Sequence, residues 1–542
     1  MDVNARVQNW LETYGGASVS AAEFLCDRHL DRPERAALIY EDGQGNTISL
    51  SYQQLHDQSA ALAGFFRDLG VEKGSRVAGL LPKGVELVLT TLAAWRLGAV
   101  YIPLFTAFGP QGVEYRLKAG EASVIVTDET NRSKLKEIPG DAVSGLKTVT
   151  VTNGDASLEP GDSSFWTALE RASPVTETAT VSGDEPMILI FTSGTTGNPK
   201  GVPVPVKALA SFEAYMRFGL DVRDEDVYWN MADPGWAYGL YYNLIGPLLL
   251  GKTILFYGGA FTPQEAYRVM HQWQVTNFAS APTAYRALMA AGDEPLQEYR
   301  PRLRVASSAG EPLNPEVINW AQSRFGVPIH DHYGQTELGM IINNHHLPEI
   351  RNELKPGSMG LGMPGFRAVV VDESGRELGP GQEGQLAIDT QASHLNWFSG
   401  YWKDEARTME RYTQDGKYCL TGDTISRDSD GYFFFSGRSD DIILSAGYRI
   451  GPFEVESVLM QHPDVTETAV IGVPDQLRGE VVKAYVVLQQ GRSGSEELAE
   501  ELTTMVKEKL SKHEYPREIE FVAELPKTPS GKIQRFLLRQ SR

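Results

Sequence analysis

Small, hydroxylated and basic residues that could wrap a polyphosphate follow an apolar run at residues 188–201, ILIFTSGTTGNPKG. The apolar part predicts a buried strand. The polar part predicts a loop whose backbone N–H groups, hydroxyls and ammonium can bind phosphate oxygens. It is not a Walker A loop, because Lys200 follows Pro199 and precedes Gly201 instead of following a glycine. A plain turn is the alternative. The expected ligand contacts are Thr192, Ser193, Gly194, Thr195, Thr196, Gly197, Asn198, Pro199 and Lys200.

Three further polar segments could bind other parts of such a ligand. Residues 331–337, DHYGQTE, place an aromatic ring beside a glycine, which suits stacking on a flat base, and end in a carboxylate that can hold Mg²⁺. Asp423 follows an apolar run, and one carboxylate can accept hydrogen bonds from both hydroxyls of a vicinal diol. Residues 308–312, SAGEP, lie between a predicted strand and a predicted helix, where open α/β sheets bind ligands. A polar loop with a core tyrosine and a proline-containing helix start are the structural alternatives.

The elements that must position these residues follow a regular pattern. Over the first two thirds of the chain, short apolar strands alternate with helical patterns, which predicts layered α/β structure with largely parallel sheets. Around Phe366 the pattern changes to strand, turn and strand, which predicts a small antiparallel or barrel-like subdomain at about residues 360–436. After Gly437 a compact α+β segment is expected. Strands are expected at 76–81, 99–103, 123–128, 275–281, 303–307, 467–471, 481–488 and 518–522, and helices at 84–97, 315–325, 453–461 and 495–511.

Composition and charge exclude several classes of protein. The 542 residues are 42% hydrophobic and 22% charged, as in ordinary globular proteins, and the length predicts about two to four domains. The net charge of −20 argues against binding to nucleic acid or to an anionic membrane surface. Cys26 and Cys419 form neither a disulfide framework nor a metal cluster and fit a reducing cytoplasm. Neither a signal peptide nor a membrane-inserted segment is expected.

The segment at 192–201 resembles the signature loop of the adenylate-forming superfamily, and further family motifs follow in order over nearly the full chain. Within the superfamily, the chain is similar to AMP-forming acyl-CoA synthetases of the short- to medium-chain type. The resemblance implies a large α/β N-terminal domain at 1–438 and a small mobile α+β domain at 439–542. The matching hinge residue is Asp440.

The resemblance also implies roles for individual residues. Thr192 and Glu337 would hold Mg²⁺, and Asp423 would bind the ribose. Lys532, which follows Ser-Gly near the C-terminus, would act with Glu337 in catalysis, because an ammonium can stabilise the charge that builds during in-line displacement. Lys527 is expected to be an ordinary solvated lysine. The other expected nucleotide contacts are Gly310, Glu311, Pro312, Asp331, His332, Tyr333, Gly334, Gln335, Thr336, Arg438 and Arg449. For His332, a packing residue or a neighbour of the adenine is expected, and not a base.

Two residues are expected to shape the acyl pocket. Acetyl-CoA synthetases of this superfamily carry a bulky tryptophan at the position that matches Gly334, so the glycine is expected to leave volume open for acids longer than acetate. Trp236, in the segment DPGWAYG, is expected to form a wall of this pocket. Ordinary core packing is the alternative for Trp236.

The implied reaction has two steps. A carboxylic acid attacks Mg·ATP to give acyl-adenylate and pyrophosphate, and coenzyme A then takes the acyl group as its thioester. Between the steps the C-terminal domain would rotate about Asp440 and bring Gly447 and Tyr448 beside coenzyme A. The alternatives are an aryl-acid CoA ligase, a stand-alone adenylation enzyme that loads a carrier protein, and a binding or regulatory protein without turnover, which the intact motifs oppose. A cytoplasmic enzyme of fatty acid metabolism is expected, and any oligomer is expected to be a homodimer.

Overall fold

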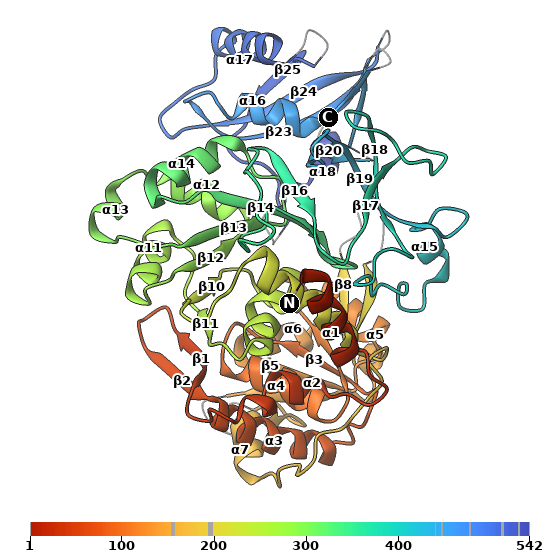
Figure 1. Cartoon of the computed structure of the whole chain (residues 1–542). Helices are drawn as coiled ribbons and strands as arrows, with labels where there is room; N and C mark the ends of the chain where they lie inside the picture. Colours follow the sequence, from red (N-terminus) through yellow and green to blue (C-terminus); the bar gives the residue numbers. More distant parts are fainter. Residues whose placement is uncertain are drawn as a thin grey trace.

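The computed structural model describes residues 2–152, 158–192, 199–439, 441–445, 448–475, 478–510, 514–528 and 532–540. The described residues form four β-sheets, flanked by helices, with the seven-stranded sheet toward one end of the molecule and the sheet of the C-terminal region at the other (Figure 1). Strands alternate with helices along the sequence in the expected order, so the layered α/β fold class is confirmed.

The first sheet is seven-stranded and parallel except for its last pair, β8 and β9, which is antiparallel. Its strands in spatial order are β7 (Ser163–Ser164), β6 (Lys147–Val151), β5 (Val124–Asp128), β3 (Arg76–Leu80), β4 (Val100–Pro103), β8 (Pro186–Thr192) and β9 (Lys200–Pro205). The helices among these strands are α3 (Tyr52–Asp68), α4 (Val85–Arg96), α5 (Pro110–Ala119), α6 (Glu129–Lys136) and α7 (Phe165–Arg171).

The second sheet is ten-stranded and changes character in its middle. Its parallel part consists of β10 (Tyr228–Asn230), β12 (Asn277–Ser280), β13 (Val305–Ala309) and β14 (Ile329–Gln335). From β14 onward every pair is antiparallel, through β15 (Gly339–Asn343), β16 (Ser358–Gly362), β20 (Phe433–Arg438), β19 (Tyr418–Arg427), β18 (Glu383–Asp389) and β17 (Ala368–Val371). The antiparallel unit predicted around residues 360–436 therefore extends the parallel sheet.

The helices beside the parallel part are α11 (Pro263–Gln272), α12 (Pro282–Ala290), α13 (Glu294–Glu298) and α14 (Pro315–Phe325). Helix α14 shows why the local sequence fixes these boundaries. It begins at a proline, whose missing N–H costs nothing in the first turn, and stops before Gly326, which has a φ of 77°. Only glycine adopts this left-handed conformation without a penalty from Cβ.

A three-stranded sheet joins the N-terminal region to the middle of the chain. Its strands in spatial order are β11 (Ile254–Tyr257), β1 (Ala36–Glu41) and β2 (Thr47–Ser51). Helices α1 (Val3–Tyr14), α2 (Ala21–Leu25) and α8 (Leu209–Ala214) share one large core with the first sheet. In the same core lie two π-helical segments, Tyr215–Gly219 and Leu240–Ile245, with the short helices α9 (Ala237–Gly239) and α10 (Gly246–Leu249).

The last sheet lies at one end of the molecule and has a hydrophobic core of its own (Figure 1). Its strands in spatial order are β22 (Tyr448–Ile450), β21 (Ile443–Ser445), β24 (Gly479–Leu488) and β23 (Val465–Asp475), with β25 (Glu518–Phe521) parallel to β24. Its helices are α16 (Pro452–Leu459), α17 (Glu496–Lys509) and α18 (Arg535–Gln540). Its helix α16 contacts the start of α14, where Asn314 Nδ2 donates to Ser457 Oγ over 3.2 Å. The short helix α15 (Glu405–Met409) follows β18.

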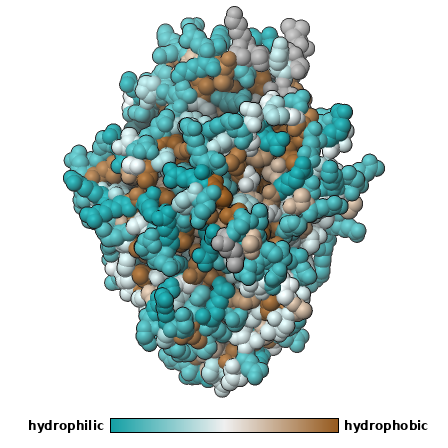
Figure 2. Space-filling view, viewed as in Figure 1, coloured by the Kyte–Doolittle hydropathy of each residue, from teal (hydrophilic) through white to brown (hydrophobic). Residues whose placement is uncertain are grey.

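Hydrophilic residues cover most of the face shown in Figure 2, with hydrophobic ones interspersed. Within the described residues, no helix combines the length and the apolar character needed to cross a bilayer.

Candidate active site

The candidate site lies where the second sheet changes from parallel to antiparallel. Strand β14 carries the DHYGQTE segment, and Glu337 sits in the turn that leads into β15. Strands β19 and β20 belong to the same sheet and pair Asp423 with Arg438 directly across from each other. Residues from motifs that are far apart in the sequence therefore meet on one sheet.

The strongest part of the site is a network of hydrogen bonds around Asp423, whose side chain is buried. Its Oδ2 accepts hydrogen bonds from the hydroxyl of Tyr333 and, over 2.9 Å, from Gln335 Nε2. Its Oδ1 lies 3.4 Å from Arg438 Nη1. Burial raises the pKa of Asp423, while the Arg438 charge opposes this shift. The structure thus brings together four residues that the sequence singled out, Tyr333, Gln335, Asp423 and Arg438.

A second group surrounds Glu337, which is 7% exposed. The Tyr401 hydroxyl donates to its Oε1 over 2.8 Å, and the Lys200 ammonium lies 4.7 Å from the centroid of the Tyr401 ring. Burial lowers the pKa of Lys200, and the Glu337 charge opposes this effect. Glu337 Oε2 accepts no hydrogen bond from the described residues, so a carboxylate oxygen is available to a hard cation such as Mg²⁺.

The two ends of the predicted phosphate loop are held together by the first sheet. Thr192 ends β8, Lys200 begins β9, and the two residues are direct partners in the antiparallel pair. The Thr192 hydroxyl donates to the Lys200 carbonyl over 3.5 Å. Pro199 accepts a 3.0 Å hydrogen bond from Tyr115 at its carbonyl. The predicted loop residues Ser193 to Asn198 lie outside the described residues.

The segment at 310–312 approaches the site beside Asp331. Leu313 N donates to Asp331 Oδ2 over 3.4 Å, and Asp331 Oδ1 is buried with no partner among the described residues. Burial raises the pKa of Asp331 well above its ordinary value. Gly310 is exposed with a φ of 103°. Glu311 lies 3.0 Å from Arg286 Nη2 in an ion pair, so its carboxylate is already engaged.

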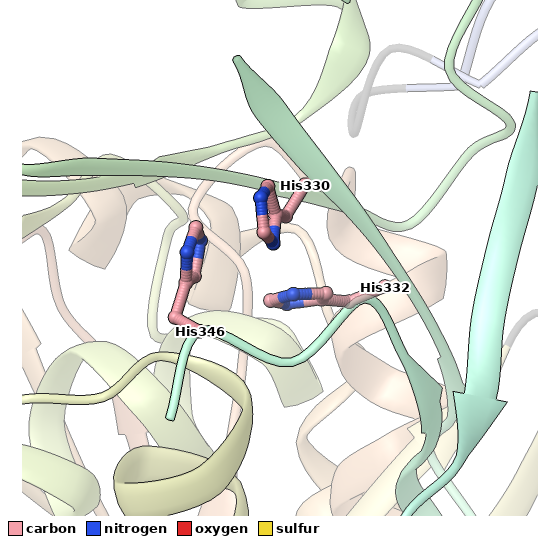
Figure 3. A group of neighbouring side chains, drawn as sticks. All are labelled: His330, His332 and His346. Carbon is pink, nitrogen blue, oxygen red and sulfur yellow. The ribbon is translucent and has the colours of Figure 1, made fainter. Parts of the chain in front are cut away.

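Strand β14 has different neighbours on its two faces, because successive side chains of a strand point to opposite sides. Asp331, Tyr333 and Gln335 alternate with His330 and His332. Figure 3 shows the rings of His330, His332 and His346 gathered behind the strand. His330 and His346 stack with their centroids 3.8 Å apart.

Hydrogen bonds fix the proton positions on this histidine cluster. His332 Nε2 donates to the Asn344 carbonyl over 3.1 Å, so its Nδ1 accepts from the Tyr215 hydroxyl over 2.8 Å. His330 Nδ1 also donates to the Asn344 carbonyl, over 2.7 Å. Burial lowers the pKa of all three imidazoles. Since both nitrogens of His332 are engaged, the cluster does not fit a three-histidine metal site, and the ring of His332 packs beside His346.

Gly334 lies against the backbone of β15. A Cβ atom there would lie 2.2 Å from the Gly339 carbonyl oxygen and 2.7 Å from Met340 Cα, so the backbone at this position requires a glycine. The glycine is explained by this close approach of two strands. That the glycine also leaves volume open for the acyl chain stays a prediction. Trp236 packs against Phe105 and Phe108, with ring centroids 5.3 Å away in each case. It is partly buried in an aromatic cluster.

Lys532 stands apart from these groups. It is exposed, its backbone N–H donates to Thr528 Oγ1 over 3.1 Å, and its carbonyl accepts from Thr528 N over 2.7 Å. Among the described residues, its ammonium contacts none of the strand residues of the site. Lys527 was expected to be solvated, which is wrong, because it forms an ion pair with Glu467 at 2.6 Å.

Several predicted residues of the C-terminal region cannot be placed in the site. Asp440 and Gly447 lie outside the described residues, as does the side chain of Arg449. Tyr448 lies on β22 and is 51% exposed.

Sequence reasoning missed two residues that complete the site, Tyr401 and Arg411. Both come from the segment between β18 and β19. Arg411 Nη2 donates to Gln335 Oε1 over 2.8 Å, and Tyr401 holds Glu337. No local motif marks either residue. The only signal in the sequence is that an aromatic residue and a basic residue shortly precede the segment around Asp423.

Comparisons with known proteins place these observations in a wider group. The family model described as AMP-binding enzyme matches residues 27–402, and that described as AMP-binding enzyme C-terminal domain matches residues 454–532. An acetyl-coenzyme A synthetase of Bacillus subtilis (strain 168) is 39% identical over 529 residues, covering 96% of this chain and 90% of that protein. The mitochondrial acyl-coenzyme A synthetase ACSM4 of Homo sapiens is 37% identical over 516 residues, covering 94% and 87%. A crystal structure of Brucella canis acyl-CoA synthetase matches with a TM-score of 0.78 at 48% identity, covering 100% of this chain and 97% of that one.

Proposed function

The chain belongs to the AMP-binding enzyme family, and from this membership we propose that it activates short- to medium-chain carboxylic acids with the strand residues described above. It is an acid–thiol ligase that works in two steps. A carboxylate oxygen attacks the α-phosphorus of ATP and pyrophosphate leaves, which gives the acyl-adenylate. The thiol of coenzyme A then attacks the acyl carbonyl, its proton is lost, and AMP leaves. Activation is needed because a free carboxylate is a poor electrophile.

The observation that carries the assignment of residues is the network around Asp423. Its Oδ2 is occupied by Tyr333 and Gln335, while Oδ1 faces Arg438 at 3.4 Å. An anchored carboxylate with an oxygen to spare suits the two hydroxyls of a ribose. Arg438 and Lys200 then supply positive charge for the phosphates, which an enzyme with a net charge of −20 needs locally.

Glu337 and Thr192 would hold Mg²⁺, and the bound ion would neutralise charge on the phosphate oxygens. Tyr401 fixes the Glu337 carboxylate through its 2.8 Å hydrogen bond, so this oxygen donor is oriented before the nucleotide arrives. Lys532 is proposed to stabilise the charge that develops on the reacting carboxylate and on the α-phosphate.

The C-terminal unit, residues 439–542, is proposed to move about Asp440 between the two steps. Lys532 is exposed in the structure and makes no contact with the described strand residues, so a movement of this unit would bring its ammonium to the phosphates. A second arrangement would present Gly447 and Tyr448 to coenzyme A. The exposure of the Tyr448 ring supports a role in contact with a ligand.

The proposed acid class rests on the aromatic cluster of Trp236, Phe105 and Phe108. A wall of this kind suits an apolar acyl chain. The relatives are named as an acetyl-coenzyme A synthetase and an acyl-coenzyme A synthetase, which supports a carboxylic acid as the substrate.

The test is release of pyrophosphate from ATP with acetate, butyrate, hexanoate, octanoate and benzoate, each with and without coenzyme A. We expect release that depends on an aliphatic acid, and sustained turnover only with coenzyme A. Benzoate as the best acid would contradict the proposed acid class and favour an aryl-acid ligase. No acid-dependent release with any of the five would contradict the proposed use of the strand residues.

A further inference from the structure

We propose that Arg411 is a positioning residue of the nucleotide site, which acts through Gln335 to hold Asp423 for the ribose. The proposal rests on the proposed function of Asp423. Arg411 follows α15 in the sequence, outside every motif described above, and reaches into the network from the segment between β18 and β19.

The contacts identify the donor and the acceptor of each hydrogen bond between Arg411 and Asp423. Arg411 carries only donors, so the atom that faces its Nη2 at 2.8 Å is the carbonyl oxygen of the Gln335 amide. The Gln335 NH₂ group is then turned toward acceptors, the Thr421 carbonyl and Asp423 Oδ2, both at 2.9 Å. Without the guanidinium, the amide could rotate and point its oxygen at the carboxylate, which would repel it.

Gln335 and Tyr333 together saturate one side of Asp423. Tyr333 donates to the same Oδ2, and Gln335 Nε2 lies 3.2 Å from the Tyr333 hydroxyl, so these two side chains brace each other. The carboxylate is thereby held in one rotamer, with Oδ1 turned toward the Arg438 side. The orientation of the proposed ribose acceptor therefore depends on Arg411 through two consecutive hydrogen bonds.

The guanidinium keeps its charge in this half-buried place. Burial opposes the charged form, but the Glu337 carboxylate, foremost among the neighbouring groups, raises the pKa of Arg411 above its ordinary value. The interaction with Gln335 is therefore present at every pH at which the enzyme works. A lysine would not replace it fully, because an ammonium lacks the planar fork that reaches Gln335 and, at the longer distance of 3.5 Å, the Thr421 carbonyl.

A merely structural role would be to brace the segment before β19. The two roles differ in what they predict for nucleotides that lack a ribose hydroxyl. If Arg411 orients Asp423, its loss weakens the hydrogen bonds to the ribose hydroxyls, so the ratio of kcat/KM between ATP and its deoxy analogues falls. If it only braces the segment, kcat/KM falls by the same factor for ATP and for the analogues.

The experiment compares Arg411→Gln, Arg411→Lys and Gln335→Met with the wild type, using ATP, 2′-deoxyATP and 3′-deoxyATP at saturating acid. For Arg411→Gln we expect kcat/KM for ATP to fall about tenfold to a hundredfold, mostly through KM, since a well-placed hydrogen bond to a charged group is lost. The preference for ATP over the deoxy analogues should fall by about tenfold, while KM for the acid stays within about twofold. Arg411→Lys should be intermediate.

Gln335→Met is the second route to the same result, and the double variant should be no worse than the single ones, because both act on one chain of contacts. The matched control is Arg376→Gln, which removes an arginine that is 82% exposed and pairs with Asp372. An unchanged preference for ATP in folded Arg411→Gln and Gln335→Met would overturn the proposal. Failure of the proposed function looks different, because the wild type itself would then show no acid-dependent pyrophosphate release.

Discussion

The two regions that hold the proposed catalytic and binding residues are built in opposite ways. On strands β14, β19 and β20 the half-buried side chains of Tyr333 and Gln335 are hydrogen-bonded to the buried carboxylate of Asp423. In the C-terminal unit, Lys532 is exposed, and among the described residues its hydrogen bonds are made by its backbone, to Thr528. The difference teaches that the residues proposed to recognise the nucleoside are held in place by the sheet, whereas the lysine proposed to act on the reacting atoms is exposed.

The largest expected effect separates the two regions by their half-reactions. Lys532→Ala should slow acyl-adenylate formation by about 10²- to 10³-fold, the usual loss when one charge-stabilising donor is removed. Thioester formation from supplied acyl-adenylate should change by less than about threefold. The two half-reactions are measured separately, by pyrophosphate release and by thioester release.

The matched control is Lys527→Ala, which removes a nearby lysine that pairs with Glu467. It should leave both half-reactions near the wild-type rate. Since Lys532 is exposed, its loss should also leave the melting temperature unchanged. Equal losses in both half-reactions would refute the contrast between the two regions.

The next effect tests the prepared region, where affinity and stability should change together. In Asp423→Asn the amide oxygen can still accept from Tyr333 and Gln335, but the negative charge is lost and an NH₂ donor replaces the oxygen that faces Arg438. We expect KM for ATP to rise about tenfold to a hundredfold and the free energy of unfolding to fall by about 1–3 kcal/mol. ATP titrations and denaturant unfolding measure the two quantities.

The exposed carboxylate Asp430, which pairs with Lys355, gives the control variant Asp430→Asn. It should change the free energy of unfolding by less than about 0.5 kcal/mol and leave KM unchanged. If Asp423→Asn raised KM without any loss of stability, the strand region would be no more preorganised than the C-terminal turn.

The smallest effect, per residue and per pH unit, concerns the buried histidines near β14. Burial lowers the pKa of His330, which lies on β14, and of His345, which follows β15, to about 4, below the ordinary value of about 6.5 for an unfolded chain. Between these values the unfolded chain binds more protons, so the free energy of unfolding falls as the pH falls from about 6.5 toward 4. The expected loss is about 1 kcal/mol per pH unit for each histidine, measured by denaturant unfolding at pH 7, 6 and 5.

His345→Gln should remove part of this pH dependence, whereas His394→Gln, at an exposed position, should leave it intact. A stability that stays constant between pH 7 and pH 5 would show that the layer behind β14 is more open to water than its burial indicates.

The sequence predicted elements well where local pattern decides the structure. Helix α14 has the bounds that were expected, because a proline start and a glycine stop mark its ends. Tyr333, Gln335, Asp423 and Arg438 were also assigned to one site, because their motifs resemble those of a family. The strand pairing that joins Asp423 to Arg438 confirms that they meet.

Other features could not be predicted because they depend on distant partners. Arg411 and Tyr401 belong to no motif, and their roles appear only when the segment after β18 folds against β14. The ion pair of Glu311 with Arg286 joins the segment after β13 to helix α12. The close approach of Gly339 to Gly334 has the same origin, because it is set by how two strands pack.

Alternate residues of strand β14 face two different environments. Even-numbered histidines face a buried layer, and odd-numbered polar residues face the proposed nucleotide site. The pH dependence of stability and the proposed preference for the nucleotide thus depend on alternate positions of one short strand. A protein that evolves in acidic surroundings can therefore change the first through its histidines and keep the second.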